Sequence, residues 1–301
     1  MSATSIDAPD PTARARAADD NARPPARKAA GRNVGLGRGR CYERSHPELP
    51  MSHAADAPHD TISIVVPAHD EEANLASVLG DAATAAARSF ADYEIVVVDD
   101  GSRDGTAAVA AAAAAGDTRI RVITHTEPHG LGGAFKAGLR EAKHEWVSVV
   151  HGNGGTDADA LASIWRARDG GDFVVPFLAN EHERPRVRRI VSRAFAGLVN
   201  LLFHTGLRYH LHYVLARRCD LADIEIRTDS NAFQAEVIVK LLRRGCRPVE
   251  VGVCDRFEEQ SPSRSLRPGH GAQIGRFFLS LLYDVYVGGD GRAPRSTSRD
   301  E

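Results

Sequence analysis

Cysteine is scarce in this sequence, and none of its four cysteines lies in a C-x-x-C pair. The sequence therefore indicates neither a zinc knuckle nor a disulfide framework, and a reducing compartment is expected. Neither sign of charge is in excess, because 38 Lys and Arg residues stand against 40 Asp and Glu, so no global field favours nucleic acid. No apolar run reaches the roughly 18 residues of a membrane-spanning helix, and no apolar signal segment follows the first residue. We therefore predict a cytoplasmic protein.

Large aliphatic side chains are nearly missing from residues 1–58, which are rich in Ala, Arg, Pro, Asp and Gly. Such a segment cannot bury enough apolar surface to offset the entropy lost on ordering. We predict a disordered tail over 1–58, one domain over 60–288 and a second disordered tail over 289–301. Met51 opens a shorter frame that leads into the first predicted strand, and we hypothesise that it is the natural start.

From residue 60 onward, short apolar runs alternate with alanine-rich segments. The runs Ile62–Val66 and Glu94–Val98 are bounded by turn formers, a pattern typical of strands buried on both faces. The alternation with helical segments predicts β-α-β units and a parallel sheet. Further strands are predicted over 119–124, 145–150, 172–177 and 247–253, and helices over 71–88, 104–116, 190–203, 232–244 and 274–287.

Acidic clusters follow the first two predicted strands. The first strand runs into Pro67-Ala68-His69-Asp70-Glu71-Glu72, and the second ends in Asp99-Asp100-Gly101-Ser102-Arg103-Asp104. Because ligands bind outside the carboxyl ends of the strands in open α/β sheets, this edge is the candidate site.

These two clusters carry a family resemblance. Residues 67–72 resemble the P-x-x-N-E-E element of family-2 glycosyltransferases, and residues 98–106 match their V-D-D-G-S-x-D-G-T element almost letter for letter. The likeness covers residues 61–266 and is nearest to the polyprenyl-phosphate (dolichyl-phosphate) sugar transferase branch. It implies a glycosyltransferase-A (Rossmann-like) fold, an α/β domain whose mostly parallel sheet is flanked by helices. The implied activity is transfer of a hexose, with inversion, from a nucleoside diphosphate sugar to a polyprenyl phosphate.

The resemblance also implies roles for individual residues. Pro67, His69 and Glu71 would line the nucleoside, and Asp99 would accept from the base or ribose. Asp100 would lie near the diphosphate and a metal ion. Beyond the last predicted strand the family has a mobile loop over the diphosphate, and there Arg264 keeps the positive charge of the family's lysine.

The family's D-x-D element is where this chain departs. Its carboxylates hold Mg²⁺ or Mn²⁺ against the donor diphosphate, because a hard cation needs oxygen ligands and the leaving group needs its charge neutralised. Here His151, Asn153 and Gly155 occupy the corresponding positions, so His151 and Asn153 are the metal candidates. The missing charges leave a second hypothesis open, a nucleotide-sugar binding protein without turnover.

A displaced D-x-D at Asp157-Ala158-Asp159 has two interpretations. It could contribute Asp157 to a metal site, or it could be the cap and acidic first turn of the next helix. We favour the cap, because the apolar residues of a helix follow directly.

The glycine cluster after the third strand excludes two nucleotide-binding motifs. A dinucleotide-binding G-x-G-x-x-G would need glycine where Phe135 stands, and a phosphate-loop NTPase would need lysine where Leu139 stands. Gly130, Gly132 and Gly138 instead fit a family element that opens a helix packed close to the sheet. A helix amino terminus near the sugar diphosphate is the alternative role.

The acceptor side offers weaker signals. Asp229 and Glu236 are the candidate catalytic residues, although a phosphate acceptor with its second pKa near 6 is nucleophilic without a strong base. Arginines at 184, 186, 188 and 189 could bind a phosphate or form a solvated helix start.

The segment 274–287 could lie in a membrane interface, giving peripheral contact with the inner face of the membrane, or pack on the domain, which we favour.

Overall fold

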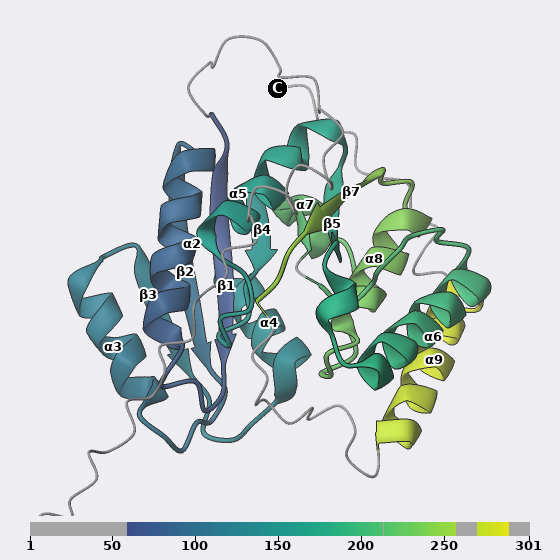
Figure 1. Ribbon diagram of the computed structural model, residues 1–301, viewed down its shortest axis with the longest axis horizontal. Helices are drawn as coiled ribbons and strands as arrows, with labels where there is room; N and C mark the ends of the chain where they lie inside the picture. Colours follow the sequence, from purple (N-terminus) through teal and green to yellow (C-terminus); the bar gives the residue numbers. More distant parts are fainter. Residues whose placement is uncertain (1–58, 213, 257–269, 289–301) are drawn as a thin grey trace, which may run out of the picture. The chain divides into compact units, whose positions relative to one another are not determined.

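A computed structural model describes residues 59–212, 214–256 and 270–288, the side chains of 270–273 excepted. Both predicted tails and Arg264 lie outside the described residues. Seven strands form one sheet in the order β3-β2-β1-β4-β6-β5-β7 (Figure 1). Only β6 runs against its neighbours within this sheet, so the expected α/β class with a mostly parallel sheet is confirmed. The strands are β1 (Thr61–Ala68), β2 (Asp92–Asp99), β3 (Ile120–Thr124), β4 (Trp146–Val149), β5 (Phe173–Leu178), β6 (Leu215–Arg217) and β7 (Pro248–Val253).

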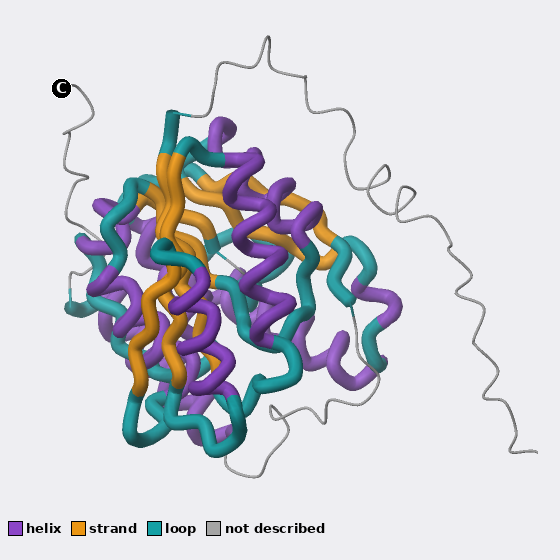
Figure 2. The backbone as a smooth tube through the Cα atoms, turned by 90° about the vertical axis from the view of Figure 1, so that its left-hand side faces the viewer, coloured by secondary structure: helices purple, strands orange, loops and turns teal. Residues whose placement is uncertain are grey.

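Helices lie on both sides of the strands (Figure 2). The α-helices are α2 (Leu75–Ser89), α3 (Thr106–Gly116), α4 (Gly130–Glu141), α5 (Ala158–Arg166), α6 (Arg186–Phe203), α7 (Arg218–Ala222), α8 (Phe233–Arg243) and α9 (His270–Tyr286). Two short 3-10 helices are η1 (Ala167–Gly170) and η2 (Glu181–Glu183).

The central strands form as expected because their apolar runs are covered on both faces. All residues of β1 after Thr61 are buried, and so are all residues of β2 after Asp92. The register pairs Ala68 with Asp99, so both strands end at the same edge. The helix α4 packs closely on β1, because a methyl group on Gly138 would approach Val65 Cγ1 to 2.4 Å. The predicted structural role of that glycine is thus confirmed.

Two expectations about the elements need correction. The helix predicted over 71–88 begins only at Leu75, because the residues before it form a loop bound to the neighbouring strand's loop. The elements β6 and α7 were not predicted. With three residues, β6 carries no recognisable pattern of its own and is a strand only through its pairing with β4 and β5.

A second apolar core lies apart from the sheet. It joins α6, α8 and α9 through buried residues that include Val199, Val239, Phe277, Leu281 and Val285. The favoured interpretation of 274–287, packing on the domain, is therefore confirmed for that face of α9. None of the helices in the described ranges is long and apolar enough to cross a membrane.

Candidate functional site

The loops after β1 and β2 are locked together by hydrogen bonds. The Asp100 amide donates to Ala68 O (2.8 Å), and His69 Nδ1 lies 2.7 Å from Asp100 O. Glu71 N donates to Thr106 Oγ1 (2.8 Å), and Gly105 N donates to the Glu72 carboxylate (2.9 Å). The acidic residues before α2 therefore stabilise the rim of the sheet rather than the first turn of a helix.

Backbone geometry fixes the turn that follows Asp100. Gly101 has φ of +68°, and a side chain there would meet the backbone of Glu127 and Pro128 at 2.9 Å. Only glycine satisfies both conditions without strain. The D-D-G sequence thus places two carboxylates at the strand end and lets the segment before α4 pass directly over them.

The residues predicted to line a nucleoside lie along one rim. Asp99 ends β2 and is 1% exposed, with Ser102 N donating to its Oδ1 (3.1 Å). The Glu71 carboxylate accepts from Asn74 Nδ2 (3.0 Å) just beyond β1. Pro67 is buried in β1 opposite Val98. Since β1 and β2 are adjacent and parallel, the geometry brings these predicted residues together.

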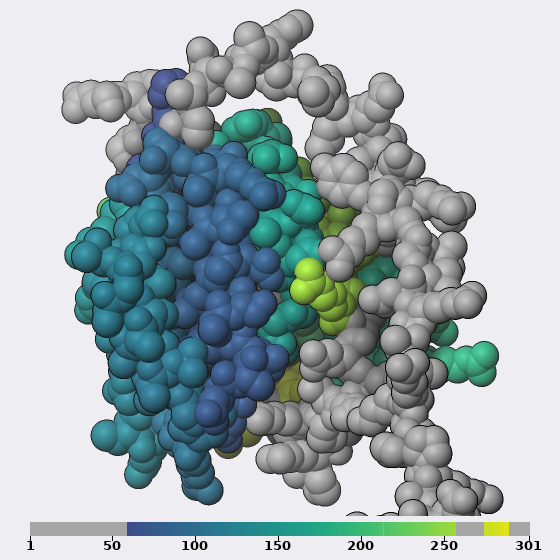
Figure 3. Space-filling view, turned by 60° about the vertical axis from the view of Figure 1, so that its left-hand side comes forward, coloured from purple at the N-terminus to yellow at the C-terminus, as the bar shows by residue number. Residues whose placement is uncertain are grey.

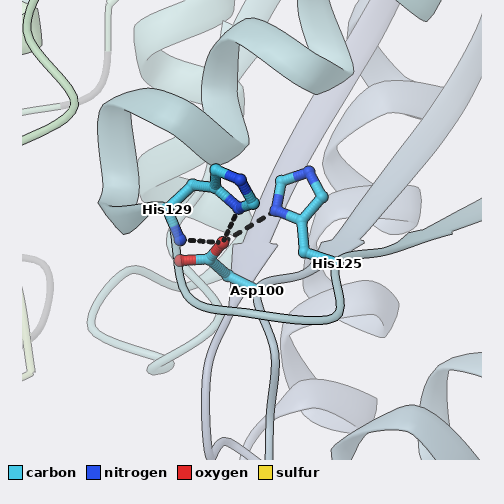
Figure 4. A group of neighbouring side chains, drawn as sticks. All are labelled: Asp100, His125 and His129. Atoms are coloured by element: carbon cyan, nitrogen blue, oxygen red, sulfur yellow. Dashed lines mark hydrogen bonds and ion pairs between the residues drawn. The ribbon is translucent and has the colours of Figure 1, made fainter.

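Asp100, predicted to lie near a metal ion and the diphosphate, is held at the start of α4. Its carboxylate accepts from the backbone amides of His129 and Gly130, each at 2.8 Å, at the amino terminus of α4. His125 Nδ1 lies 2.8 Å and His129 Nδ1 3.8 Å from the same Oδ1 (Figure 4). This carboxylate therefore joins β2 to the start of α4, with two imidazole rings beside it.

This group could hold a divalent metal. Across the described ranges, Asp100, His125 and His129 are the one set of at least three His, Cys, Asp or Glu whose ligand atoms all lie within 4.8 Å of one another. Two imidazole nitrogens and one carboxylate suit Mn²⁺ or Zn²⁺ better than Mg²⁺, which prefers oxygen. Sequence reasoning missed both histidines, although His129 directly precedes the glycine cluster that it singled out.

The glycines of α4 make room for the segment that carries Asp229. A methyl group on Gly132 would lie 2.4 Å from Thr228 O, and the Gly132 amide donates to Asp229 O (2.8 Å). The Asp229 carboxylate, 62% exposed, pairs with Lys136 Nζ at 2.6 Å. Asp229 is thus held beside the first turns of α4, and His129 lies at the start of the same helix.

Glu236, the other predicted catalytic residue, is buried inside α8. Its two oxygens accept from Arg227 N (2.9 Å) and Thr228 N (3.0 Å), and Lys240 Nζ lies 3.0 Å away. Lys240 also pairs with Asp284 of α9 at 3.1 Å. Glu236 therefore stabilises the segment that presents Asp229 and does not face solvent.

The two predicted metal ligands at the end of β4 lie in unlike environments. Gln234 Nε2 lies 2.9 Å from His151 Nε2, and burial, reinforced by nearby His212, lowers the His151 pKa to about 4. Asn153 is exposed. No set of three His, Cys, Asp or Glu ligand atoms gathers around them in the ranges that the structure covers. A neutral imidazole and one amide oxygen fit Mg²⁺ poorly.

A carboxylate that the sequence did not reveal lies behind this loop. Asp255 follows β7 and accepts from Thr156 Oγ1 (2.7 Å), while His212 Nε2 lies 3.1 Å away. Burial alone would raise the Asp255 pKa, but His212 and Thr156 outweigh it and lower that pKa. Its charge is thus already engaged within the protein.

The loop before α5 supports the cap interpretation. Asp157 is the N-cap of α5 and accepts from Ala160 N at 3.0 Å, while Asp159 in the first turn pairs with Arg88. The Arg256 amide donates to Gly155 O (2.7 Å), and Figure 3 shows the yellow-green segment after β7 against the teal surface of this loop. The residues after β7 therefore lie against the loop that follows β4.

Comparisons with known proteins identify relatives of this chain. Human dolichyl-phosphate beta-glucosyltransferase is 34% identical over 108 residues, covering 34% of this chain and 33% of that protein. Undecaprenyl-phosphate 4-deoxy-4-formamido-L-arabinose transferase of Pseudomonas aeruginosa is 31% identical over 233 residues, covering 76% of this chain and 65% of its own length. The chain thus spans from about a third to just under two thirds of these relatives.

Solved structures give the fold. Glucosyl-3-phosphoglycerate synthase from Mycobacterium tuberculosis, in complex with Mn²⁺, UDP and phosphoglyceric acid, superposes with a TM-score of 0.60 at 20% identity. The match covers 74% of this chain and 78% of that one, and it confirms the glycosyltransferase-A fold. The family model for glycosyl transferase family 2 matches residues 63–218, just over half of the chain. The motifs at the ends of β1 and β2, the fold and this match together establish that the chain belongs to glycosyl transferase family 2.

Proposed function

We propose that this enzyme transfers a hexose, with inversion, from a nucleoside diphosphate sugar to a polyprenyl phosphate at the cytoplasmic face of a membrane. The donor assignment is carried by one observation: Glu71 and Asp99 lie on the same rim of adjacent parallel strands. A solved structure of the same fold has UDP bound in its complex, which supports a nucleoside diphosphate here. The acceptor assignment is supported by two relatives named for transfer to dolichyl and undecaprenyl phosphates.

The candidate bases favour an acceptor that needs little deprotonation. Glu236 is buried and bound to two backbone amides and to Lys240, while Lys136 pairs with Asp229. A phosphate monoester with its second pKa near 6 is already largely ionised at pH 7. A polyprenyl phosphate would therefore react without a strong general base, whereas a sugar hydroxyl would need one.

A divalent ion would be held by Asp100, His125 and His129 rather than by His151 and Asn153. The former set offers one carboxylate and two imidazoles within reach of a single ion, which fits Mn²⁺. When bound, such an ion supplies positive charge near the rim where a diphosphate would develop negative charge. The neighbouring structures that contain Mn²⁺ make a metal-dependent donor site the first arrangement to test.

The direct test is a transfer assay with the purified full-length chain. It is supplied with UDP- or GDP-hexoses and a detergent-solubilised polyprenyl phosphate, with and without Mn²⁺. We expect a polyprenyl phosphohexose by mass spectrometry and an inverted anomeric configuration by NMR. No product with any donor, together with tight binding of a nucleotide sugar, would support the binding protein without turnover instead.

Asp229→Asn separates the two acceptor chemistries. With a polyprenyl phosphate, we expect the variant to keep transfer within about tenfold of the wild type, because no general base is removed. A loss of about 100-fold or more, the contribution of a general base, would contradict transfer to the phosphate without such a base. Asp223→Asn is the matched control, because Asp223 is likewise exposed and paired with a cation, Arg244.

A further inference from the structure

Exposed large apolar side chains are confined to one part of the molecule. Among the described residues, every such side chain lies on α6, on α9 or directly after α9. They are Val187, Ile190, Val191, Leu198, Leu201, Ile274, Leu279, Tyr283, Tyr286 and Val287. A gathering of this kind on an otherwise polar surface marks an interaction site.

The apolar residues of α6 form a stripe along its length. Val187, Ile190 and Val191 recur at helical spacing with Leu198 and Leu201, of which Ile190 is 67% and Leu201 71% exposed. The opposite face of α6 packs into the second core. Core packing therefore explains one face of this helix and leaves the other apolar face unexplained.

The helix α9 lies beside α6 and adds a second exposed apolar face (Figure 1). The rings of Phe195 and Phe278 are 5.5 Å apart, and Tyr286 donates to Leu202 O at 2.5 Å. Leu279 is 69% exposed, and Tyr283 is 55% exposed. Tyrosine with an apolar ring and a polar tip is the residue type that favours a boundary between hydrocarbon and water.

The exposed charges that the structure describes on the two helices are of one sign. The sequence of α6 contains four arginines and no acidic residue, and the exposed Arg276 lies on α9. The acidic residue of α9, Asp284, is buried against Lys240 and Arg227. The described outer faces of these helices therefore combine apolar side chains with arginine, without an exposed carboxylate.

We propose that the outer faces of α6 and α9 bind an anionic phospholipid bilayer, with the helices lying in its interfacial plane. Arginines beside an apolar stripe match anionic headgroups above hydrocarbon. A second copy of the chain fits less well, because packing α6 against α6 would bring arginines of like charge together. The inference builds on the proposed function, since a bilayer is the medium that contains a polyprenyl phosphate.

The test is sedimentation of the full-length chain with vesicles, without donor or acceptor. We expect binding to vesicles of phosphatidylglycerol and phosphatidylcholine that weakens with salt, and little binding to phosphatidylcholine alone. Ile190→Glu with Leu201→Glu should weaken binding by tenfold or more. Ala111→Glu, an exposed position on α3, should leave it unchanged. Circular dichroism of each variant verifies that the fold is retained.

Three results would overturn the proposal. The first is equal vesicle binding by the wild type and the α6 variant, and the second is no binding of the wild type to anionic vesicles. The third is a wild-type dimer, detected by light scattering, that becomes a monomer in the α6 variant while vesicle binding stays unchanged. Transfer to a detergent-solubilised acceptor is measured on the same preparations. Failure of vesicle binding with intact transfer rejects this surface alone, whereas vesicle binding without transfer rejects the proposed function alone.

Discussion

The rim formed by β1 and β2 and the region formed by α6, α8 and α9 are stabilised in opposite ways. At the rim, short loops are locked by backbone donors to carboxylates, and Asp99 and Asp100 are stabilised by neighbouring amides. In the helical region, buried side-chain charges stabilise the structure instead, because Lys240 pairs with both Glu236 and Asp284. Among these contacts only the Asp99–Ser102 bond and the Lys240–Glu236 pair join residues close in sequence, whereas the Asp100 bonds and the Lys240–Asp284 pair join distant segments.

The two regions meet at Asp229. The Glu236 carboxylate accepts a hydrogen bond from the backbone just before Asp229. The glycines of α4, next to His129, leave space for that same backbone. A substitution of one of these buried charges should therefore also alter the structure of the rim. Substitutions in each region test how far the two regions are independent.

The largest effect is expected from Lys240→Met. This change leaves the carboxylates of Glu236 and Asp284 buried without their shared cation, which costs about 3–5 kcal/mol. Urea unfolding followed by circular dichroism measures the free energy of unfolding. Lys143→Met, at an exposed position, should change it by less than about 0.5 kcal/mol. Equal effects of the two changes would show that the buried charges do not hold the region together.

Acid should destabilise the protein through His151, which is half-buried, and His210, which is buried. Burial lowers the pKa of both His151 and His210 to about 4, below the unfolded value of 6.5. The unfolded chain then binds more protons between these values, so stability is complete above pH 6.5 and falls as the pH decreases towards 4. The loss is up to about 3 kcal/mol per histidine.

Replacing His151 by Gln should flatten this dependence, whereas His182→Gln, at a ring that is 73% exposed on η2, should not. The free energy of unfolding, measured at intervals from pH 7 to pH 4, gives the pH dependence of stability for both variants. Parallel curves for the wild type and His151→Gln would contradict a neutral imidazole at the end of β4.

A pair of glycine substitutions examines the junction of the two regions. Gly132→Ala forces a methyl group to 2.4 Å from Thr228 O and should cost about 1–3 kcal/mol. Gly80→Ala, in α2 with nothing within 4 Å of the new methyl group, should stabilise by about 0.5–1 kcal/mol. Thermal unfolding distinguishes these outcomes, and a stabilised Gly132→Ala would show that the loop can move away freely.

The smallest effect is expected from Asn153→Asp. A single exposed carboxylate at the end of β4 adds at most about 1 kcal/mol towards a cation held at Asp100, or at most about fivefold in affinity. Mn²⁺ titration in the presence of UDP measures this change against the wild type. An increase of 100-fold or more would instead show that the native β4 end is a metal site lacking one ligand.

The elements that could be predicted are those whose pattern is local. The strands β1 and β2, their acidic turns and the Asp157 cap are encoded by residues within a few positions of one another. The Asp100 group could not be found in this way, because His125 and His129 reach Asp100 only through the turn from β3 to α4. Glu236 was expected at the acceptor side, and its burial depends on Lys240 and on Asp284, far along the chain.

The helix α9 shows a second limit. The helical spacing of its apolar residues predicts one side with Phe277, Phe278, Leu281, Leu282 and Val285, but it cannot say whether that side packs on the domain or lies in a membrane interface. The structure buries Phe277, Phe278, Leu281 and Val285 and exposes Leu279 and Tyr283. Only packing against α6 and α8 decides between the two roles.

Calorimetric titration of UDP and GDP tests the central claim, that the rim of β1 and β2 takes up the nucleoside of the donor. The account predicts binding of one nucleotide to the wild type and a loss of at least about tenfold in Asp99→Asn, since a hydrogen bond to a charged group is worth about 1.5–3 kcal/mol. Asp92→Asn, at the opposite end of the same strand, should bind as the wild type does. Equal affinity of all three proteins, or no binding by the wild type, would contradict it.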